Sequence, residues 1–213
     1  MMEQFGIINF PAFLLAGILL NLTPGSDTMY ILARSLSLGR RAGVLSALGI
    51  STGAVIHTIA AACGLSVILA NSATAYLVVK YAGALYLIYL GIRSIIGART
   101  KAPQYQKNIR AASDRHIYFS GVITNVLNPK VALFFLAFLP QFIIVGANSS
   151  VASFLILGTT FIFTGTMWCL CLALFSSAIV ARISGKGNGS AILHRISGGI
   201  FIILGIKLAF GNK

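Results

Sequence analysis

Acidic residues are almost missing from this chain of 213 residues, and charged residues of either sign are scarce. Asp and Glu together number 3, and only 9% of the residues are charged, against about 25% in an average soluble domain. So little charge cannot cover a polar surface, which excludes a soluble globular fold. The hydrophobic fraction of 57% and the mean hydropathy of +0.91 indicate instead that the solvent is lipid.

Sites for metals, nucleotides and paired carboxylates are missing as well. The three cysteines, Cys63, Cys169 and Cys171, lie inside apolar runs, without a Cys-x-x-Cys spacing or a histidine suited to zinc. No Walker loop or dinucleotide fingerprint is present. An intramembrane aspartyl protease needs two carboxylates that share a proton, and one carboxylate at most lies within an apolar run. We therefore predict no enzyme activity, no metal and no cofactor.

Basic residues give the chain a formal net charge of +13, and their placement decides what this charge means. They cluster in alternate gaps between apolar runs, near residues 34–41, 93–115 and 182–195, whereas the gaps at 71–75 and 146–150 carry no charge. Such alternation is typical of the cytoplasmic loops of a membrane protein and not of a surface that follows phosphates. We predict no nucleic-acid partner.

Six apolar stretches are long enough to cross a bilayer, which takes about 20 helical residues. They cover approximately residues 5–33, 43–70, 75–97, 117–145, 151–180 and 191–210. The whole chain, 1–213, is thus predicted to be one all-α, polytopic membrane domain of about six helices. With the basic gaps in the cytoplasm, both termini lie outside.

The longest polar connector, at about residues 99–115, divides the chain into halves of three stretches each, about 1–98 and 116–213. Because three is odd, the second half enters the membrane from the opposite side. This is the arithmetic of an inverted repeat, a common construction of secondary transporters. Asn-Leu-Thr-Pro at 21–24 and Asn-Val-Leu-Asn-Pro at 125–129 interrupt the first and fourth stretches. Since proline cannot donate to the helical ladder, we expect broken helices at Pro24 and Pro129.

Asp27 is the one carboxylate within an apolar stretch, where an ionisable group is costly and indicates function. We expect Thr23 to cap a new half-helix with Pro24 at its first position, followed by Gly25 and Ser26. The free amides of that first turn would suit a carboxylate. The alternative is that the first stretch ends near Thr23 and leaves Asp27 in a loop.

The interruption of the fourth stretch places a lysine beside a second proline. Asn128 is expected to cap the next half-helix and Pro129 to start it, with Asn125 one turn before and Lys130 in the first turn. Lys130 should lie near mid-membrane, where it pairs with Asp27 or meets a substrate carboxylate. The alternative is that it snorkels to an interface.

The second stretch carries small residues at steps of three and four, namely Gly49, Gly53, Ala60 and Gly64, with His57 among them. In a bilayer, small residues allow close backbone approach, so this face should pack against protein. His57 is then a proton relay or pocket lining, or else a packing residue.

At these positions the chain resembles the LysE/RhtB superfamily of amino-acid exporters, from about residue 5 to 210. The resemblance is carried by Pro24-Gly25-x-Asp27, Gly39–Gly43, Gly49 with Gly53 and His57, Lys80–Gly91, Asn128-Pro129-Lys130 and Phe138–Phe142. It implies six helices and proton-coupled efflux of amino acids or homoserine-type compounds. The family usually has Pro-Gly-Pro, and here Ser26 stands in place of the second proline.

We therefore predict a proton-driven exporter of neutral or hydroxylated amino acids, such as threonine or homoserine, in the bacterial plasma membrane. Asp27 would bind the substrate ammonium or the coupling proton, and the amides after Pro24 and Pro129, with Asn128 and Lys130, would receive the carboxylate. The alternatives are a divalent-cation exporter and a membrane scaffold subunit that does not transport. The sequence leaves open which substrate and ion are carried and whether the chain forms a homo-oligomer.

Overall fold

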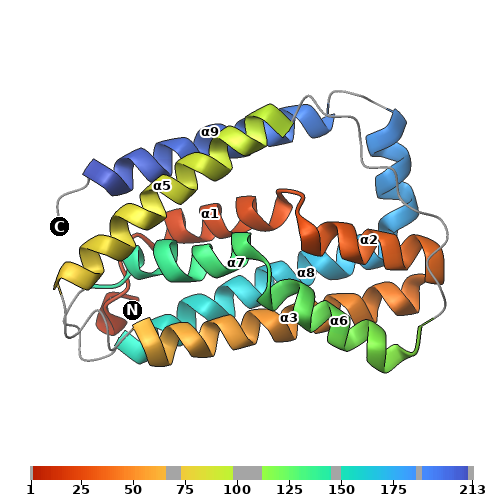
Figure 1. The fold of residues 1–213 in the computed structure, drawn as a ribbon, viewed down its shortest axis with the longest axis horizontal. Helices are drawn as coiled ribbons and strands as arrows, with labels where there is room; N and C mark the ends of the chain where they lie inside the picture. The colour runs from red at the N-terminus through yellow and green to blue at the C-terminus, as the bar shows by residue number, and fades with distance from the viewer. Residues whose placement is uncertain (1, 66–72, 98–111, 145–149, 186–188, 211–213) are drawn as a thin grey trace.

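The computed structural model describes residues 2–65, 73–97, 112–144, 150–185 and 189–210, which are almost entirely helical (Figure 1). The helices are α1 (Phe10–Leu22), α2 (Ser26–Leu38), α3 (Arg40–Ala60), α5 (Ala73–Gly97), α6 (Asp114–Val126), α7 (Pro129–Leu133), α8 (Ser150–Gly185) and α9 (Gly189–Phe210). A π-helical turn continues α3 to Leu65, and π- and 3-10-helical turns continue α7 to Phe142. The predicted all-α class is confirmed.

Several of these elements are long and apolar enough to cross a membrane. Arg40–Leu65 and Val151–Ala178 qualify as single helices, and Asp114–Val126 with Pro129–Phe142 forms a third span bent by 46°. Phe10–Leu22 is apolar but shorter. The chain is therefore a polytopic helical membrane protein, whereas the count of six spans stays a prediction.

Both predicted helix breaks are confirmed. Three residues separate α1 from α2, and two separate α6 from α7. In Figure 1 the broken helix α1–α2 runs in the opposite direction to α6–α7. Each broken helix is followed by a long helix, α3 or α8, and then by α5 or α9. The same order of elements, run in opposite directions, favours an inverted repeat. Most of the predicted linker at 99–115 lies outside the described residues.

Small residues bring the helices of two pairs close together. A Cβ atom added at Gly49 would lie 2.2 Å from the Tyr118 carbonyl oxygen, so α3 and α6 approach at backbone distance. At Gly198 it would lie 2.6 Å from the Gly91 carbonyl oxygen, which brings α9 equally close to α5. The predicted packing face of α3 is wrong at its end, because Ala60 and Gly64 are exposed.

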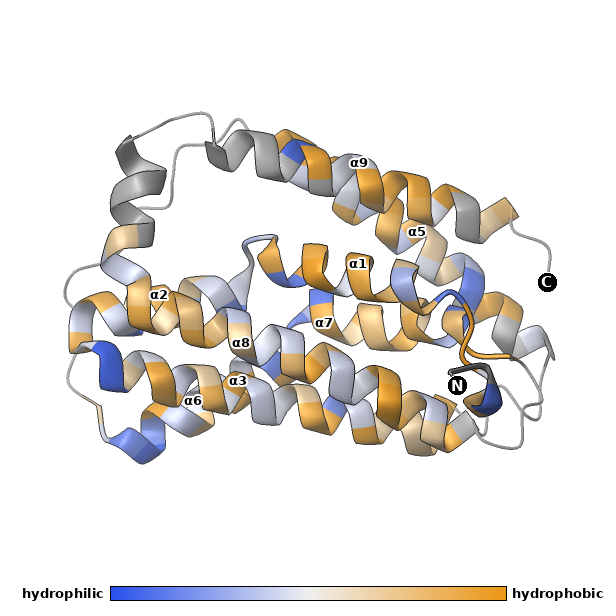
Figure 2. Ribbon diagram, turned by 180° about the vertical axis from the view of Figure 1, so that it is seen from behind, coloured by the Kyte–Doolittle hydropathy of each residue, from blue (hydrophilic) through white to orange (hydrophobic). Residues whose placement is uncertain are grey.

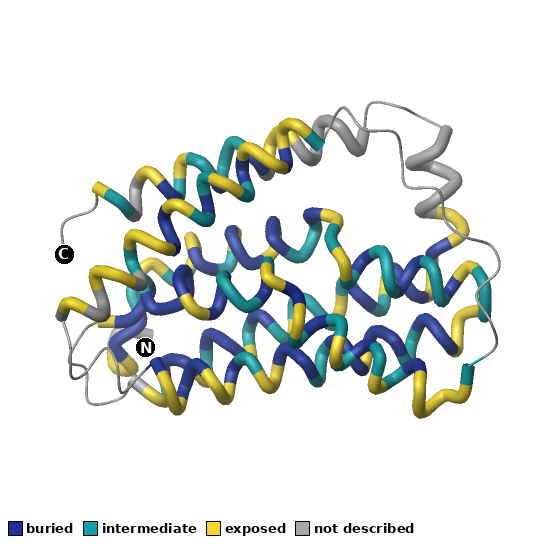
Figure 3. The backbone as a smooth tube through the Cα atoms, viewed as in Figure 1, coloured by how far each residue is buried: buried dark blue, intermediate teal, exposed yellow. Residues whose placement is uncertain are grey.

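Buried residues, dark blue in Figure 3, lie along the helices of the bundle, and the apolar ones form two clusters among the described residues. The larger is built on phenylalanines of α1, α7 with its continuation, and α8, including Phe13, Phe134, Phe138 and Phe161. The smaller joins α2, α3 and α8 through residues such as Ile31 and Leu172. Hydrophilic residues gather where α3 and α6 begin (Figure 2), and there Arg41 forms an ion pair with Asp114.

Candidate functional site

At the first helix break, the end of α1 has backbone carbonyls that no backbone N–H fills. Pro24 has no N–H to donate to the Leu20 carbonyl oxygen four residues earlier, which the helical ladder would otherwise fill. The Thr23 hydroxyl donates to the Leu19 carbonyl oxygen at 2.7 Å. Thr23 therefore closes α1, and the prediction that it caps α2 is wrong. The residue before a proline avoids the helical conformation, and Thr23 is accordingly extended.

The second half of the broken helix begins later than predicted. Gly25, in extended conformation, occupies the N-cap position of α2, and Ser26 is the first helical residue. Pro24 thus lies exposed in the break rather than at the first helical position. Because glycine has no side chain to cap the helix, no side-chain hydrogen bond is made at this N-terminus. The first turn of α2 carries Asp27 there, so the alternative that Asp27 lies in a loop is wrong.

At the second helix break, residues of the break itself accept the hydrogen bonds of the first amides of α7. Pro129 is the first residue of α7, and the Asn128 side-chain oxygen accepts a hydrogen bond from the Lys130 amide at 3.0 Å, as predicted. The Val131 and Ala132 amides donate to the Asn128 carbonyl oxygen at 3.1 and 3.0 Å. These amides are therefore bonded within the break itself, and their binding of a substrate carboxylate stays a prediction.

Lys130 connects the two breaks. Its ammonium donates to the carbonyl oxygens of Leu20 at 3.0 Å and of Thr23 at 2.8 Å. A cation at the C-terminus of a helix complements the helix dipole and fills orphan carbonyls. A Cβ atom at Gly25 would lie 3.1 Å from this ammonium, so the glycine leaves room for it. Lys130 neither snorkels to an interface nor forms an ion pair with Asp27 among the described residues.

Asp27 is held by an asparagine of the opposite broken helix. The Asn125 side-chain amide donates to the Asp27 carboxylate at 2.8 Å, and the neighbouring Ser26 hydroxyl lies 3.4 Å from its other oxygen. Asn125 is only 2% exposed, whereas Asp27 is half-buried. The exposed Ser26, which replaces the usual family proline, is compatible with this helix start because α2 begins at that residue.

Helix α3 holds Asn125 in place from behind. A Cβ atom at Gly53 would lie 2.7 Å from the Asn125 Cβ atom, a distance that real structures do not allow. His57 Nε2 lies 3.2 Å from the Asn125 carbonyl oxygen, and its ring stacks on Phe135 with centroids 5.7 Å apart. His57 thus packs behind the site and does not line the cavity described next.

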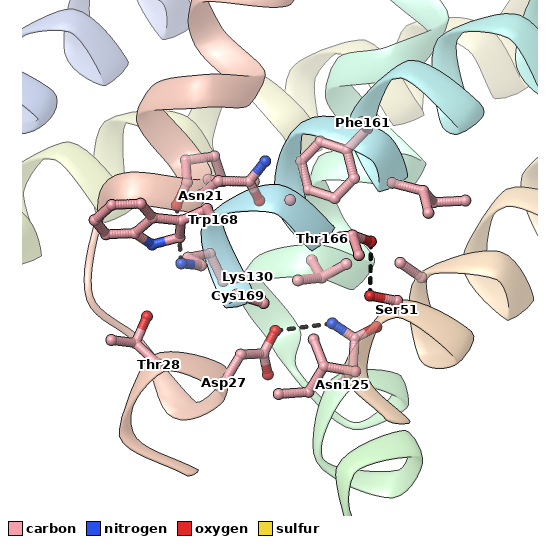
Figure 4. Close-up of a pocket in the computed structure, with 16 residues that line it drawn as sticks. Asn21, Asp27, Thr28, Ser51, Asn125, Lys130, Phe161, Thr166, Trp168 and Cys169 are labelled. Carbon is pink, nitrogen blue, oxygen red and sulfur yellow. Dashed lines mark hydrogen bonds between the residues drawn. The ribbon is translucent and has the colours of Figure 1, made fainter. Parts of the chain in front are cut away.

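Asp27 and Lys130 line one cavity between the two breaks (Figure 4). Its volume is about 40 Å³, which is room for water but not for an amino acid. Polar and apolar side chains both contribute to its walls. The polar ones are Asn21, Asp27, Thr28, Ser51, Asn125, Lys130 and Thr166, and the apolar ones include Leu20, Ile50, Val131, Phe161, Ile162 and Trp168.

Sequence reasoning did not select Ser51 of α3 or Trp168 of α8, which both line this cavity. The Ser51 and Thr166 hydroxyls lie 2.7 Å apart and join the two helices at the cavity wall. The Trp168 indole N–H is buried and has no partner among the described residues. Thr160 and Thr164 bond to carbonyls of the preceding turn instead. A polar side chain within an apolar run is the sequence signal for a functional position. This signal does not distinguish a side chain that lines the cavity from one that bonds to a carbonyl of its own helix.

One sequence pattern of hydrolases is present but misplaced for catalysis. Gly49-Ile-Ser-Thr-Gly53 has the letters of a nucleophile elbow, which requires a sharp turn between a strand and a helix. Here Ser51 lies in the middle of α3, and its hydroxyl donates to the Ala47 carbonyl oxygen at 2.9 Å. The geometry therefore gives no support to a serine nucleophile. No group of three metal-binding side chains occurs among the described residues.

Comparison with known proteins agrees with this membrane architecture. Residues 18–212 match the family model described as LysE type translocator. An uncharacterized membrane protein, YrhP of Bacillus subtilis (strain 168), is 30% identical over 191 residues, covering 86% of this chain and 90% of the relative. Leucine efflux proteins of Salmonella choleraesuis (strain SC-B67) and Salmonella paratyphi A (strain ATCC 9150 / SARB42) are 28% identical over 214 residues, covering 98% of both chains. No solved structure matches the chain.

Proposed function

The chain belongs to the LysE family of translocators, and from this premise we propose that it exports neutral amino acids across the bacterial plasma membrane. The observation that carries the proposal is the pairing of one carboxylate and one ammonium, Asp27 and Lys130, on the wall of a single cavity at two helix breaks. An amino acid carries both charges on groups attached to the same carbon atom. A site with both opposite charges is complementary to that zwitterion.

In this proposal the substrate ammonium binds the Asp27 carboxylate. The substrate carboxylate binds the Lys130 ammonium, the uncapped amides after Pro24 and the unpartnered Trp168 indole N–H. These donors replace the water that a carboxylate loses on leaving solution. Asn125 and Gly53 position Asp27 through the contacts described above. Asn128 and Pro129 shape the second break, and His57 supports Asn125 from α3.

Coupling to protons is proposed because Asp27 is the one carboxylate that lines the cavity. A proton and the substrate ammonium then compete for the same carboxylate, so each leaves the site when the other binds. The cavity of about 40 Å³ cannot hold the substrate, so the broken helices must separate to admit it. Such competition together with alternating access gives antiport.

Six spans with both termini outside the cell are proposed because basic and uncharged gaps alternate along the sequence. The basic residues at the starts of α3 and α6 share one end of the structure, which we assign to the cytoplasm (Figure 2). A cysteine at Ser72 or Asn148 should react with an impermeant thiol reagent in intact cells, and one at Gln104 should not. These three positions lie outside the described residues. Labelling at Gln104 would overturn the orientation.

Efflux from loaded cells tests the export itself. Cells that overproduce the chain are loaded with leucine, threonine, homoserine or alanine, and the loss of each from the cytoplasm is followed. Faster loss of at least one, abolished when the proton gradient is collapsed, is expected. Leucine belongs in this panel because two relatives carry the name leucine efflux protein. No faster loss of any would favour a subunit that does not transport.

A further inference from the structure

An apolar groove lies directly beside the central cavity, between α1 and α8. Its volume is about 350 Å³, and its walls include Ile18 and Leu22 from α1 with Phe163 and Met167 from α8. Ile18, Phe163 and Met167 are exposed, so the groove opens on the outside of the bundle. It is much larger than the cavity of about 40 Å³ that Asp27 and Lys130 line.

A single layer of side chains separates the groove from the central cavity. Asn21 and Trp168 line both spaces. The Asn21 amide donates to the Thr164 hydroxyl at 3.4 Å, a long and therefore weak hydrogen bond. A Cβ atom at Gly165 would lie 3.2 Å from the Asn21 side-chain oxygen, so Asn21 is free of a larger neighbour on that side. Asn21 and Trp168 are therefore the side chains that would have to move for the two spaces to join.

We propose that this groove is the subsite for the side chain of the transported amino acid. The inference rests on the proposed function, since it takes the charged ends of the substrate to bind at Asp27 and Lys130. The central cavity has no room for a side chain as well, whereas the groove next to it is apolar and roomy. With the wall open, a substrate fixed by its charged ends would direct its side chain past Trp168.

The lining predicts which amino acids the subsite favours. Each methylene group transferred from water to an apolar wall favours binding, and the groove offers aliphatic carbon from α1 and aromatic and thioether groups from α8. A charged side chain would lose its hydration without gaining a partner. The substrate class is therefore an amino acid with an aliphatic side chain, with leucine bound more tightly than alanine.

Filling the groove tests the proposal. Met167→Trp adds bulk inside it, and Leu174→Trp is the matched control. Leu174 follows Met167 by two helical turns on the exposed side of α8 and does not line the groove. The protein is reconstituted in vesicles, and the KM of counterflow is measured for leucine and for alanine. In Met167→Trp the leucine KM should rise about tenfold and the alanine KM should change little, because loss of apolar pocket contacts typically costs about 10- to 200-fold.

Three results would contradict the proposal. Equal changes for leucine and alanine in Met167→Trp would mean that the groove does not hold the side chain. The same leucine-selective loss in Leu174→Trp would mean that bulk on α8 matters wherever it is placed. If Met167→Trp does not reach the membrane, Ile18→Trp fills the groove from α1 and should give the same leucine-selective loss. Its absence would leave lipid as the occupant of the groove. Transport of neither amino acid by the unmodified protein would instead contradict the proposed function.

Discussion

The sequence at both helix breaks contains an asparagine and a proline, and yet the free backbone groups of the two breaks find hydrogen-bond partners in different ways. At Asn128-Pro129 the asparagine side chain and carbonyl, both local, bond the first amides of α7. At the break after Leu22, the free carbonyls of Leu20 and Thr23 bond to Lys130, more than one hundred residues further along the chain. The following helix α2 has no side-chain cap at all.

This difference separates a structural break from one that a ligand can alter. Local hydrogen bonds re-form wherever the second break moves, so α7 can keep its start in every state of a transport cycle. The first break keeps its bonds only while Lys130 stays against α1. A substrate carboxylate that attracts Lys130 would release the end of α1 and change how the two broken helices pack. The following predictions test this comparison.

The largest effect is expected at the first break, for Asp27→Asn. The amide keeps the size of the side chain but cannot carry the charge that binds an ammonium or exchanges a proton. We expect uphill efflux to fall at least about 100-fold, which corresponds to roughly 3 kcal/mol of lost charged interaction. Downhill exchange of substrate should be less affected. The measurement is efflux from vesicles with and without an imposed pH gradient.

Asp114→Asn is the matched control for this substitution. Asp114 is the carboxylate in the exposed ion pair with Arg41, at the opposite end of α6 from the second break. Exposed ion pairs contribute little, about 0–1 kcal/mol, so transport should stay near the unmodified level. Uphill, pH-dependent efflux in Asp27→Asn would show that the proton travels elsewhere, and His57 would be tested next.

Lys130→Met should combine a loss of transport with a loss of stability. Methionine keeps much of the apolar stem but leaves the Leu20 and Thr23 carbonyls without a donor. A buried acceptor without a partner costs about 1–3 kcal/mol, so the thermal midpoint in detergent should fall along with efflux. Lys130→Arg keeps the charge and should retain more of both. Unchanged thermal stability of Lys130→Met would show that Lys130 does not complete the first break.

A smaller effect is expected for Gly53→Ala, which acts on Asp27 through Asn125. The added methyl group would meet the Asn125 side chain and push its amide away from the carboxylate. Loss of one such hydrogen bond, about 1 kcal/mol, corresponds to about a fivefold rise in KM. Gly64→Ala is the control on the same helix, because a Cβ atom there would meet no atom within 4 Å. Equal KM values in both variants would remove Gly53 from the site.

The sequence was sufficient to predict the features that depend on neighbours along the chain. The apolar stretches, both proline breaks and the Asn128 cap all follow from local rules. Asp27 and Lys130 also emerged, because a charge inside an apolar stretch is rare enough to be noticed. The glycine pattern predicted that α3 would pack closely, and Gly49 and Gly53 confirm it.

Features that depend on distant contacts could not be predicted in this way. Lys130 bonds to free backbone carbonyls, which are present at the C-terminal end of every helix. The sequence therefore does not show which helix end Lys130 contacts. Thr23 was misassigned because its hydroxyl can bond backward to α1 as well as forward to α2, and only the geometry decides. Ser51, Thr166 and Trp168 join the cavity through the packing of α3 and α8, which no local pattern specifies.

The smallest effect on transport is expected at the second break, for Asn128→Ala. This substitution removes the side-chain cap of α7, and the loss of such a cap costs about 1 kcal/mol. The thermal midpoint in detergent should therefore fall slightly. Because Pro129 still starts the helix and the backbone bonds to the Asn128 carbonyl do not involve the side chain, α7 should begin at the same residue. Transport should then stay unchanged, in contrast to the losses expected for Asp27→Asn and Lys130→Met. A loss of transport as large as in Lys130→Met would show that the second break also contacts the substrate, and the two breaks would then have equivalent functions.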